Sequence, residues 1–162
     1  MLIAQKIKFF PVFIAGLLGI AANMILLKIA TLLSIKAESG GLLKLMFKII
    51  PSLFAFPALH SELFWLFFHV LTGTGMILLY FLWFAQLPIN KWIKGCLFSF
   101  FPWIVNGFVV LPLLGQGIMG IHILPVSGIT YFFFANLVFA LILSVLSETH
   151  VTYPEYLFRK HS

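Results

Sequence analysis

Residues 77–84 read Ile-Leu-Leu-Tyr-Phe-Leu-Trp-Phe, an apolar run inside a stretch, 63–90, that carries no formally charged residue. A helix needs about 20 apolar residues to cross the hydrocarbon core of a bilayer. A strand of a membrane barrel would instead alternate polar and apolar residues, which this run does not do. Because a helix satisfies its own backbone hydrogen bonds in lipid, the run predicts a transmembrane helix.

The composition of the whole chain agrees with a membrane environment. Of its 162 residues, 62% are hydrophobic and 9% are charged, whereas about 25% are charged in an ordinary soluble domain. A soluble fold of this size leaves roughly a third of its chain surface wet, so it cannot hide this much apolar area. We therefore expect one all-α domain, an integral membrane bundle of four transmembrane helices.

Charge-free stretches and helix breakers divide the chain into four predicted spans, near residues 10–33, 63–86, 95–114 and 127–147. Between the first two lies segment 42–59, which is too short and too charged to span. Lys44 and Lys48 are four residues apart and share one helix face. We expect a short interfacial helix here, ended by Pro51, and the alternative is a loop tucked against the bundle.

The positions of lysine and arginine predict the orientation, because these residues concentrate on the cytoplasmic side of membrane proteins. Four spans place both termini on one side, which carries six basic residues against three on the other. The six are Lys6, Lys8, Lys91, Lys94, Arg159 and Lys160, and the three are Lys36, Lys44 and Lys48. We expect both termini, with the tail 148–162, in the cytoplasm.

Several classes of function lack their sequence signals. The ten basic residues are scattered and form no stripe for nucleic acid. The single Cys96 excludes an internal disulfide and a CxxC motif. No GxSxG or HExxH motif occurs, and no Asp or Glu lies within a predicted span. We expect neither an enzyme nor a metal or other cofactor.

Polar residues inside spans are costly and therefore informative. Asn23, Asn106 and Asn136 fall near the middle of three different spans, where asparagines can form hydrogen bonds between helices. The alternative for these three is a binding site. Lys28 is the one formal charge well inside a span; its ammonium could reach the headgroups or face an anionic ligand.

A second polar group is expected on the non-cytoplasmic side, and it consists of His60, His69, Gln116 and His122. It could be a satisfied polar layer, a pH-responsive or substrate site, or a haem or metal site. Gln116 lies in the stretch 112–120, Pro-Leu-Leu-Gly-Gln-Gly-Ile-Met-Gly. Such a sequence favours non-helical backbone, either as an ordinary turn or as a re-entrant elbow facing a ligand or partner.

The order of these features resembles one family over about residues 62–147. A His opens one span, a Tyr follows eleven residues later, and a Pro turn and a Gly precede the next span and its Pro-Leu-Leu-Gly elbow; the residues are His69, Tyr80, Pro88, Gly95, Trp103 and 112–120. This pattern is similar to the YagU-like small four-helix inner-membrane proteins. The resemblance implies a helical bundle in a prokaryotic inner membrane and supplies no activity. The chain differs at residues 135–138, Ala-Asn-Leu-Val, where a His-bearing segment is expected.

The sequence leaves three functions open. The first is a non-enzymatic accessory or assembly subunit of a larger membrane complex, or a homo-oligomer, because 20 Phe residues offer rigid surface to lipids and other subunits. The second is a small transporter or ligand-binding or lipid-binding bundle, whose site would use His69, Asn106, Gln116 and His122, with Lys28; a central cavity lined by these residues would favour it. The third is a haem-binding subunit.

Overall fold

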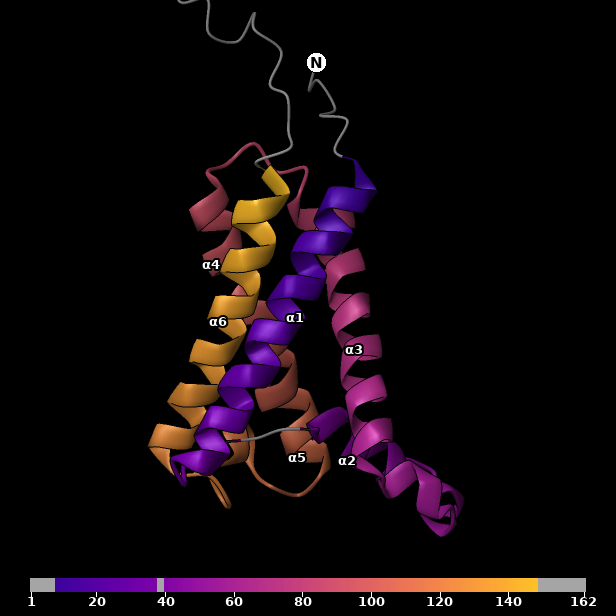
Figure 1. Ribbon diagram of the computed structural model, residues 1–162. Coiled ribbons are helices and arrows are strands. Elements are labelled where there is room, and N and C mark those ends of the chain that lie inside the picture. Colours follow the sequence, from indigo (N-terminus) through magenta and orange to yellow (C-terminus); the bar gives the residue numbers. More distant parts are fainter. Residues whose placement is uncertain (1–7, 38–39, 149–162) are drawn as a thin grey trace, which may run out of the picture.

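The computed structural model describes residues 8–37 and 40–148, and this part of the chain is helical without strands. Four of its helices are long and apolar enough to cross a membrane: α1 (Phe9–Leu32), Glu62–Phe84, Lys91–Leu113 and α6 (Val126–Glu148) (Figure 1). The second consists of α3 (Glu62–Leu79) and the π-helical turn η3 (Tyr80–Phe84). The third joins α4 (Lys91–Val105), the π-helical turn η4 (Asn106–Val110) and α5 (Leu111–Leu113).

The predicted number and order of the long helices are confirmed, and the ends differ by a few residues. The largest difference is at the third helix, which begins at Lys91 because the Asn90 side chain caps it, with Oδ1 accepting a hydrogen bond from Trp92 N at 2.8 Å. Lys94 therefore lies inside this helix, whereas the sequence predicts a helix that begins after it, at residue 95. The expected tail 148–162 lies outside the described residues except Glu148, which ends α6.

The connection between α1 and α3, where the sequence predicts a short interfacial helix, contains a short helix. Helix α2 (Gly41–Ile49) ends before Pro51, and two turns of 3₁₀ helix follow, η1 (Pro51–Ala55) and η2 (Pro57–His60). Figure 1 shows this segment at the end of the bundle away from the start of α1. Several of its large side chains are exposed, with Phe54 at 66% and Phe56 at 58%.

Helix α6 packs along both α1 and α4, and α3 packs against α1. Glycines allow the close approaches. A Cβ on Gly16 would lie 2.2 Å from the side chain of Ile77, and one on Gly73 would lie 2.5 Å from that of Ile20. Helices α1 and α3 thus meet through two reciprocal glycine contacts, in which each helix contributes one glycine and one isoleucine. Such small residues let apolar helices pack backbone to backbone.

A buried ion pair joins α4 to α6 at the end of the bundle where α6 terminates. Lys94 Nζ lies 2.5 Å from Glu148 Oε1, and it also donates a hydrogen bond to the backbone oxygen of Ala85 at 3.1 Å. The side chains of Lys94 and Glu148 are only 2% and 8% exposed. The sequence predicts Lys94 as a surface charge that marks the topology, and the structure corrects this because its ammonium has a carboxylate partner on the neighbouring helix.

One turn deeper, a chain of hydroxyl groups connects three helices. Tyr80 Oη donates to Ser144 Oγ at 2.9 Å, and Ser144 Oγ donates to the backbone oxygen of Lys91 at 2.7 Å. Tyr80 and Ser144 are both fully buried. The hydroxyls and the ion pair together fix this end of the bundle. The opposite half, toward α2, holds the cavity described next.

Candidate functional site

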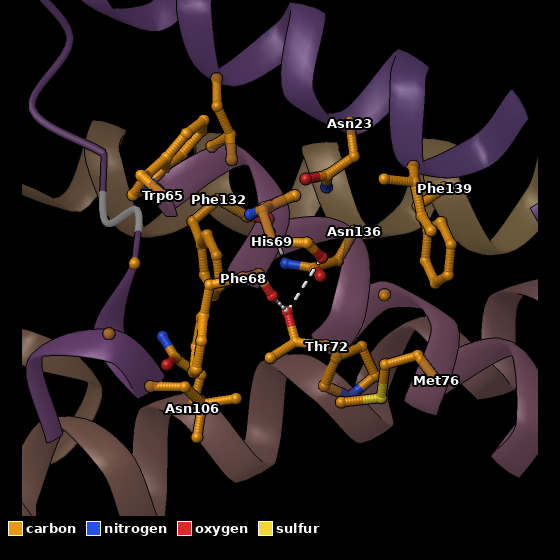
Figure 2. A pocket seen from close by; sticks show the side chains of 17 residues that line it. Asn23, Trp65, Phe68, His69, Thr72, Met76, Asn106, Phe132, Asn136 and Phe139 are labelled. Carbon is orange, nitrogen blue, oxygen red and sulfur yellow. Dashed lines mark hydrogen bonds between the residues drawn. The ribbon is translucent and has the colours of Figure 1, made fainter. Parts of the chain in front are cut away.

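A cavity of about 130 Å³ lies between α1, α3, α4–η4 and α6, with the start of α2 at one side. Its walls are mostly apolar and include several aromatic rings (Figure 2). The lining residues are Ile20, Asn23, Leu27, Gly40, Gly41, Leu42, Trp65, Phe68, His69, Thr72, Gly73, Met76, Pro102, Asn106, Phe132, Asn136 and Phe139. None of them carries a formal charge.

The cavity follows from the way the helices pack. Helix α3 is fitted to α1 through the Gly73 contact, whereas α6 is the helix that packs along both α1 and α4. The space that remains between α3 and the α4–α6 pair is filled only in part, by rings such as Phe68 and Phe132. The interiors of folded proteins are otherwise close-packed, so an unfilled space of this size is a distinct feature of the bundle.

Four helical segments contribute polar side chains to this space. Asn23 comes from α1, His69 and Thr72 from α3, Asn106 from η4 and Asn136 from α6. In Figure 2, Asn23, His69 and Asn136 lie near one another, and Asn106 lies apart from them. The start of α2 lies against Asn106, because a Cβ on Gly41 would come within 2.8 Å of Asn106 Oδ1.

Some of these groups are already satisfied by the backbone. Thr72 Oγ1 donates to the backbone oxygens of Phe68 and His69, at 3.0 Å each. Asn136 Nδ2 donates to the backbone oxygen of Phe132 at 2.8 Å. Each of these bonds lies within the residue's own helix, so the Thr72 lone pairs and Asn136 Oδ1 keep their capacity to accept from another group.

Two amides differ, because they make no hydrogen bond among the described residues, and of the two only Asn106 has a fully enclosed polar atom, Nδ2. Asn23 is 8% exposed, and no hydrogen bond of its side chain is found there. Asn106 Nδ2 is fully buried and likewise has no acceptor. Leaving a buried amide unbonded costs about 1–3 kcal/mol, so buried polar groups without a partner call for an explanation.

The ring of His69 is held by a neighbouring aromatic side chain, and no hydrogen bond of this ring is found in the described part of the chain. Its ring stacks on Trp65 with centroids 5.2 Å apart and an angle of 27° between the planes. The indole of Trp65 also lies 6.0 Å from Lys28 Nζ, in the range of a cation–π contact. Lys28 itself is exposed and does not line the cavity.

The structure divides the predicted ligand site. His69 and Asn106 line the cavity together with the other two predicted interhelical asparagines, Asn23 and Asn136. Lys28, Gln116 and His122 do not line it. No hydrogen bond found among the described residues joins two of these asparagines: Asn136 binds its own helix, and Asn106 Nδ2 has no acceptor there.

The other predicted polar residues have separate surroundings. His60 stacks on Phe47 with centroids 5.0 Å apart, and its Nε2 lies 3.0 Å from the backbone oxygen of Phe54. Gln116 and His122 lie in the connection after α5, where the backbone nitrogen of His122 donates to the oxygen of Gln116 at 3.1 Å. His60, Gln116 and His122 therefore do not share the cavity of His69.

The stretch 112–120 forms a folded connection with left-handed backbone at several positions. Gly115, Gly117 and Gly120 have φ values of 80°, 77° and 75°, and Met119 has a φ of 56°. Met119 packs onto η4, because a Cβ on Gly107 would lie 2.1 Å from its Sδ. The connection supports the π-helical turn that carries Asn106, although it does not reach the cavity.

The aromatic residues of the cavity were missed from the sequence. Trp65, Phe68 and Phe132 are aromatic residues in apolar helices, and only the packing separates rings that line the cavity from rings that face outward. Within the described residues, no three His, Cys, Asp or Glu side chains lie close enough to share a metal ion. No protein-family model, curated protein or solved structure matches the chain, so the YagU-like resemblance stays a prediction.

Proposed function

We propose that this protein is an integral membrane bundle that binds a small uncharged molecule in the cavity between its helices. The observation that carries the proposal is a cavity whose described lining residues are uncharged and include two amides, Asn23 and Asn106, that make no hydrogen bond among the described residues. A neutral ligand with hydrogen-bonding groups would satisfy both amides. The largely apolar walls with a few polar groups match the usual make-up of small-molecule sites.

The membrane location is supported by the outer surface of the helices. The exposed residues of α3 and η3 include Leu63 at 75%, Phe67 at 60%, Leu71 at 54%, Leu78 at 48% and Leu82 at 51%. They recur at helical spacing and form an apolar stripe along the outside of the bundle. Contiguous apolar surface of this kind belongs against lipid or protein rather than water. We therefore propose that membrane lipids contact this outer surface.

The same reasoning extends to orientation. The burial of Lys94 in an ion pair removes it from the count of surface charges, and the remaining basic residues still favour the side that holds the termini. We place both termini in the cytoplasm of a prokaryotic cell, the protein in its inner membrane, and α2 with η1 and η2 at the opposite membrane interface. The cavity then lies in the non-cytoplasmic half.

The first function that the sequence favoured, an accessory subunit or a homo-oligomer, remains as the second candidate. The apolar stripe on α3 supports it, since α3 is the least buried of the four long helices. Another protein chain would cover this stripe as well as lipid does. Mass measurement after purification in a mild detergent tests it: an assembly is expected, and a lone monomer would count against it.

Binding is tested with Trp65 as a fluorescent reporter in a variant that lacks the other three tryptophans, W83F/W92F/W103F. Trp83 and Trp92 are largely exposed, and at Trp103, whose ring packs against Phe100 and Phe133, phenylalanine keeps an aromatic ring. Purified protein is titrated with phenol and, separately, with benzoate. We expect phenol to change Trp65 fluorescence in a saturable way, and benzoate to have no such effect because burying a charge is costly.

A matched pair of variants separates the cavity from the surrounding detergent. Thr72→Leu fills the cavity, and Thr74→Leu makes the same change two residues away on the same helix, at a residue that does not line it. Both hydroxyls bind their own helix, Thr74 with a bond to the backbone oxygen of Val70 at 2.8 Å. Saturable binding should disappear in Thr72→Leu and persist in Thr74→Leu. Equal binding in the two variants would overturn the proposal.

A further inference from the structure

We infer that the cavity takes an uncharged six-membered ring with oxygen atoms at two opposite edges, the chemistry shared by hydroquinones and quinones. This inference rests on the proposed binding function and adds the class of ligand. Three features of the cavity support this class of ligand: its size, the aromatic rings of its walls, and the two separate positions of the Asn23 and Asn106 amides.

The volume sets the size of the occupant. A cavity of roughly 150 Å³ in a protein core accommodates benzene, and the cavity here measures about 130 Å³. One six-membered ring therefore fills it. A phosphate group would meet no cation among the described lining residues.

The walls favour a flat ring over an aliphatic chain. Trp65, Phe68, Phe132 and Phe139 all line the cavity, and the ring of His69 is already stacked on Trp65. Aromatic rings attract one another in offset or edge-to-face arrangements beyond the effect of area alone. An aliphatic occupant would gain only the burial of its surface.

The polar groups stand at two ends of the space. Asn23, His69 and Asn136 form one end, and Asn106 forms the other, next to the start of α2. The Asn106 amide, whose enclosed Nδ2 has no acceptor among the described residues, can donate to a ligand oxygen at its end once the side chain turns toward the cavity, and the Asn23 amide can donate at the opposite end. A ring with one oxygen at each end satisfies both amides at once.

The acceptors of the cavity extend this match to hydroxyl groups. Asn23 Oδ1, Asn136 Oδ1 and one nitrogen of the His69 ring can each accept a hydrogen bond at the first end. A carbonyl oxygen on the ligand ring would accept hydrogen bonds from the amide donors. A hydroxyl group would accept a hydrogen bond from a donor of the site and donate one to an acceptor. The site therefore suits both the carbonyl and the hydroxyl form of such a ring.

The experiment uses three probes with the same ring and two, one or no hydroxyl groups: 1,4-dihydroxybenzene, phenol and benzene. They are titrated into the Trp65 reporter variant in mild detergent, with Thr72→Leu as the baseline for partition into the micelle. Each buried hydrogen bond contributes about a factor of ten in affinity. We expect 1,4-dihydroxybenzene to bind roughly tenfold more tightly than phenol, and phenol more tightly than benzene.

Three leucine variants assign the two ends. Asn23→Leu and Asn106→Leu should each weaken 1,4-dihydroxybenzene roughly tenfold and leave benzene binding unchanged or tighter. Gln116→Leu is the matched control, because Gln116 Oε1 is also buried without a partner among the described residues but lies away from the cavity. It should change none of the three affinities.

The outcomes separate the inference from the proposed function. If all three rings bind equally, and Thr72→Leu abolishes that binding, the cavity is a site for small apolar molecules and the inference on ligand class is wrong. If no ring binds saturably to the reporter protein, both proposals fail. If Gln116→Leu weakens binding as much as Asn106→Leu does, the assignment to this cavity is refuted.

A last arm distinguishes a water-borne ring from one that is carried in the lipid. A 1,4-dihydroxybenzene with a ten-carbon alkyl chain is compared with the plain ring, in protein reconstituted into phosphatidylcholine vesicles. If the alkylated ring binds more tightly than its partition into protein-free vesicles explains, the ligand is carried in the membrane. Loss of binding on alkylation assigns a free ring that enters from water.

Discussion

The buried ion pair between Lys94 and Glu148 should behave as a coupled unit. Replacing Lys94 with Met leaves a carboxylate with 8% exposure opposite an apolar side chain, and replacing Glu148 with Met leaves an ammonium with 2% exposure. Breaking a buried pair from one side typically costs about 3–5 kcal/mol, because the remaining charge loses the compensation of the opposite charge. We expect each single variant to lose about that much free energy of unfolding.

The double variant Lys94→Met/Glu148→Met should be more stable than either single variant. Replacing both members of a buried pair with apolar residues is often neutral, and here the Ala85 backbone oxygen also loses its 3.1 Å hydrogen bond from Lys94. That bond is worth about 1–3 kcal/mol, so the double variant should lose no more than this amount. The expected coupling between the two positions is therefore several kcal/mol.

The assay is reversible unfolding of the purified protein in mixed micelles, followed by circular dichroism, for the parent chain and the three variants. A double-mutant cycle gives the coupling energy directly. Gln86→Leu, an exposed position in the turn before α4, serves as a surface control. Additive losses, with the double variant the least stable of all, would refute the view that the two charges stabilise each other in the buried state.

Two further predictions concern packing and the hydroxyl chain. Gly16→Ala places a methyl group 2.2 Å from the Ile77 side chain and should destabilise the bundle by about 1–3 kcal/mol. Gly75→Ala has no atom within 4 Å of its Cβ position and should stabilise the bundle by up to about 1 kcal/mol. Thermal unfolding in detergent measures both, and the opposite order of stabilities would contradict the α1–α3 packing. Tyr80→Phe removes the hydrogen bond to Ser144 and should cost about 1 kcal/mol in the same assay. No loss would show that the hydroxyl is dispensable.

Much of the fold could be predicted from local sequence. The absence of charge over long stretches marks helices that lipid can surround, and Pro51 marks the end of α2. The boundary at Lys94 failed, since a lysine near a predicted helix end is as compatible with an exposed ammonium as with a paired one. The distance to Glu148 decides between them, and that carboxylate lies 54 residues away along the chain.

The candidate site, like the fold, could be predicted from the sequence only in part. Asn23, Asn106, Asn136 and His69 stand out in sequence as polar residues in apolar helices, but sequence spacing grouped His69 with Gln116 and His122 instead of Asn23 and Asn136. Helices α1 and α6 are apolar on nearly every side. Hydrophobic periodicity therefore does not reveal which face of these helices turns inward.

The sequence by itself determined the four long helices, the short helix between the first two, and the identity of the polar residues within them. Only the tertiary structure decided that three asparagines and one histidine from four helical segments line one cavity, and that Lys28, Gln116 and His122 do not. The physical reason is that hydropathy and helix breaking act over a few residues. The inward face of an apolar helix is instead chosen by its contacts with other helices, such as glycine against isoleucine between α1 and α3.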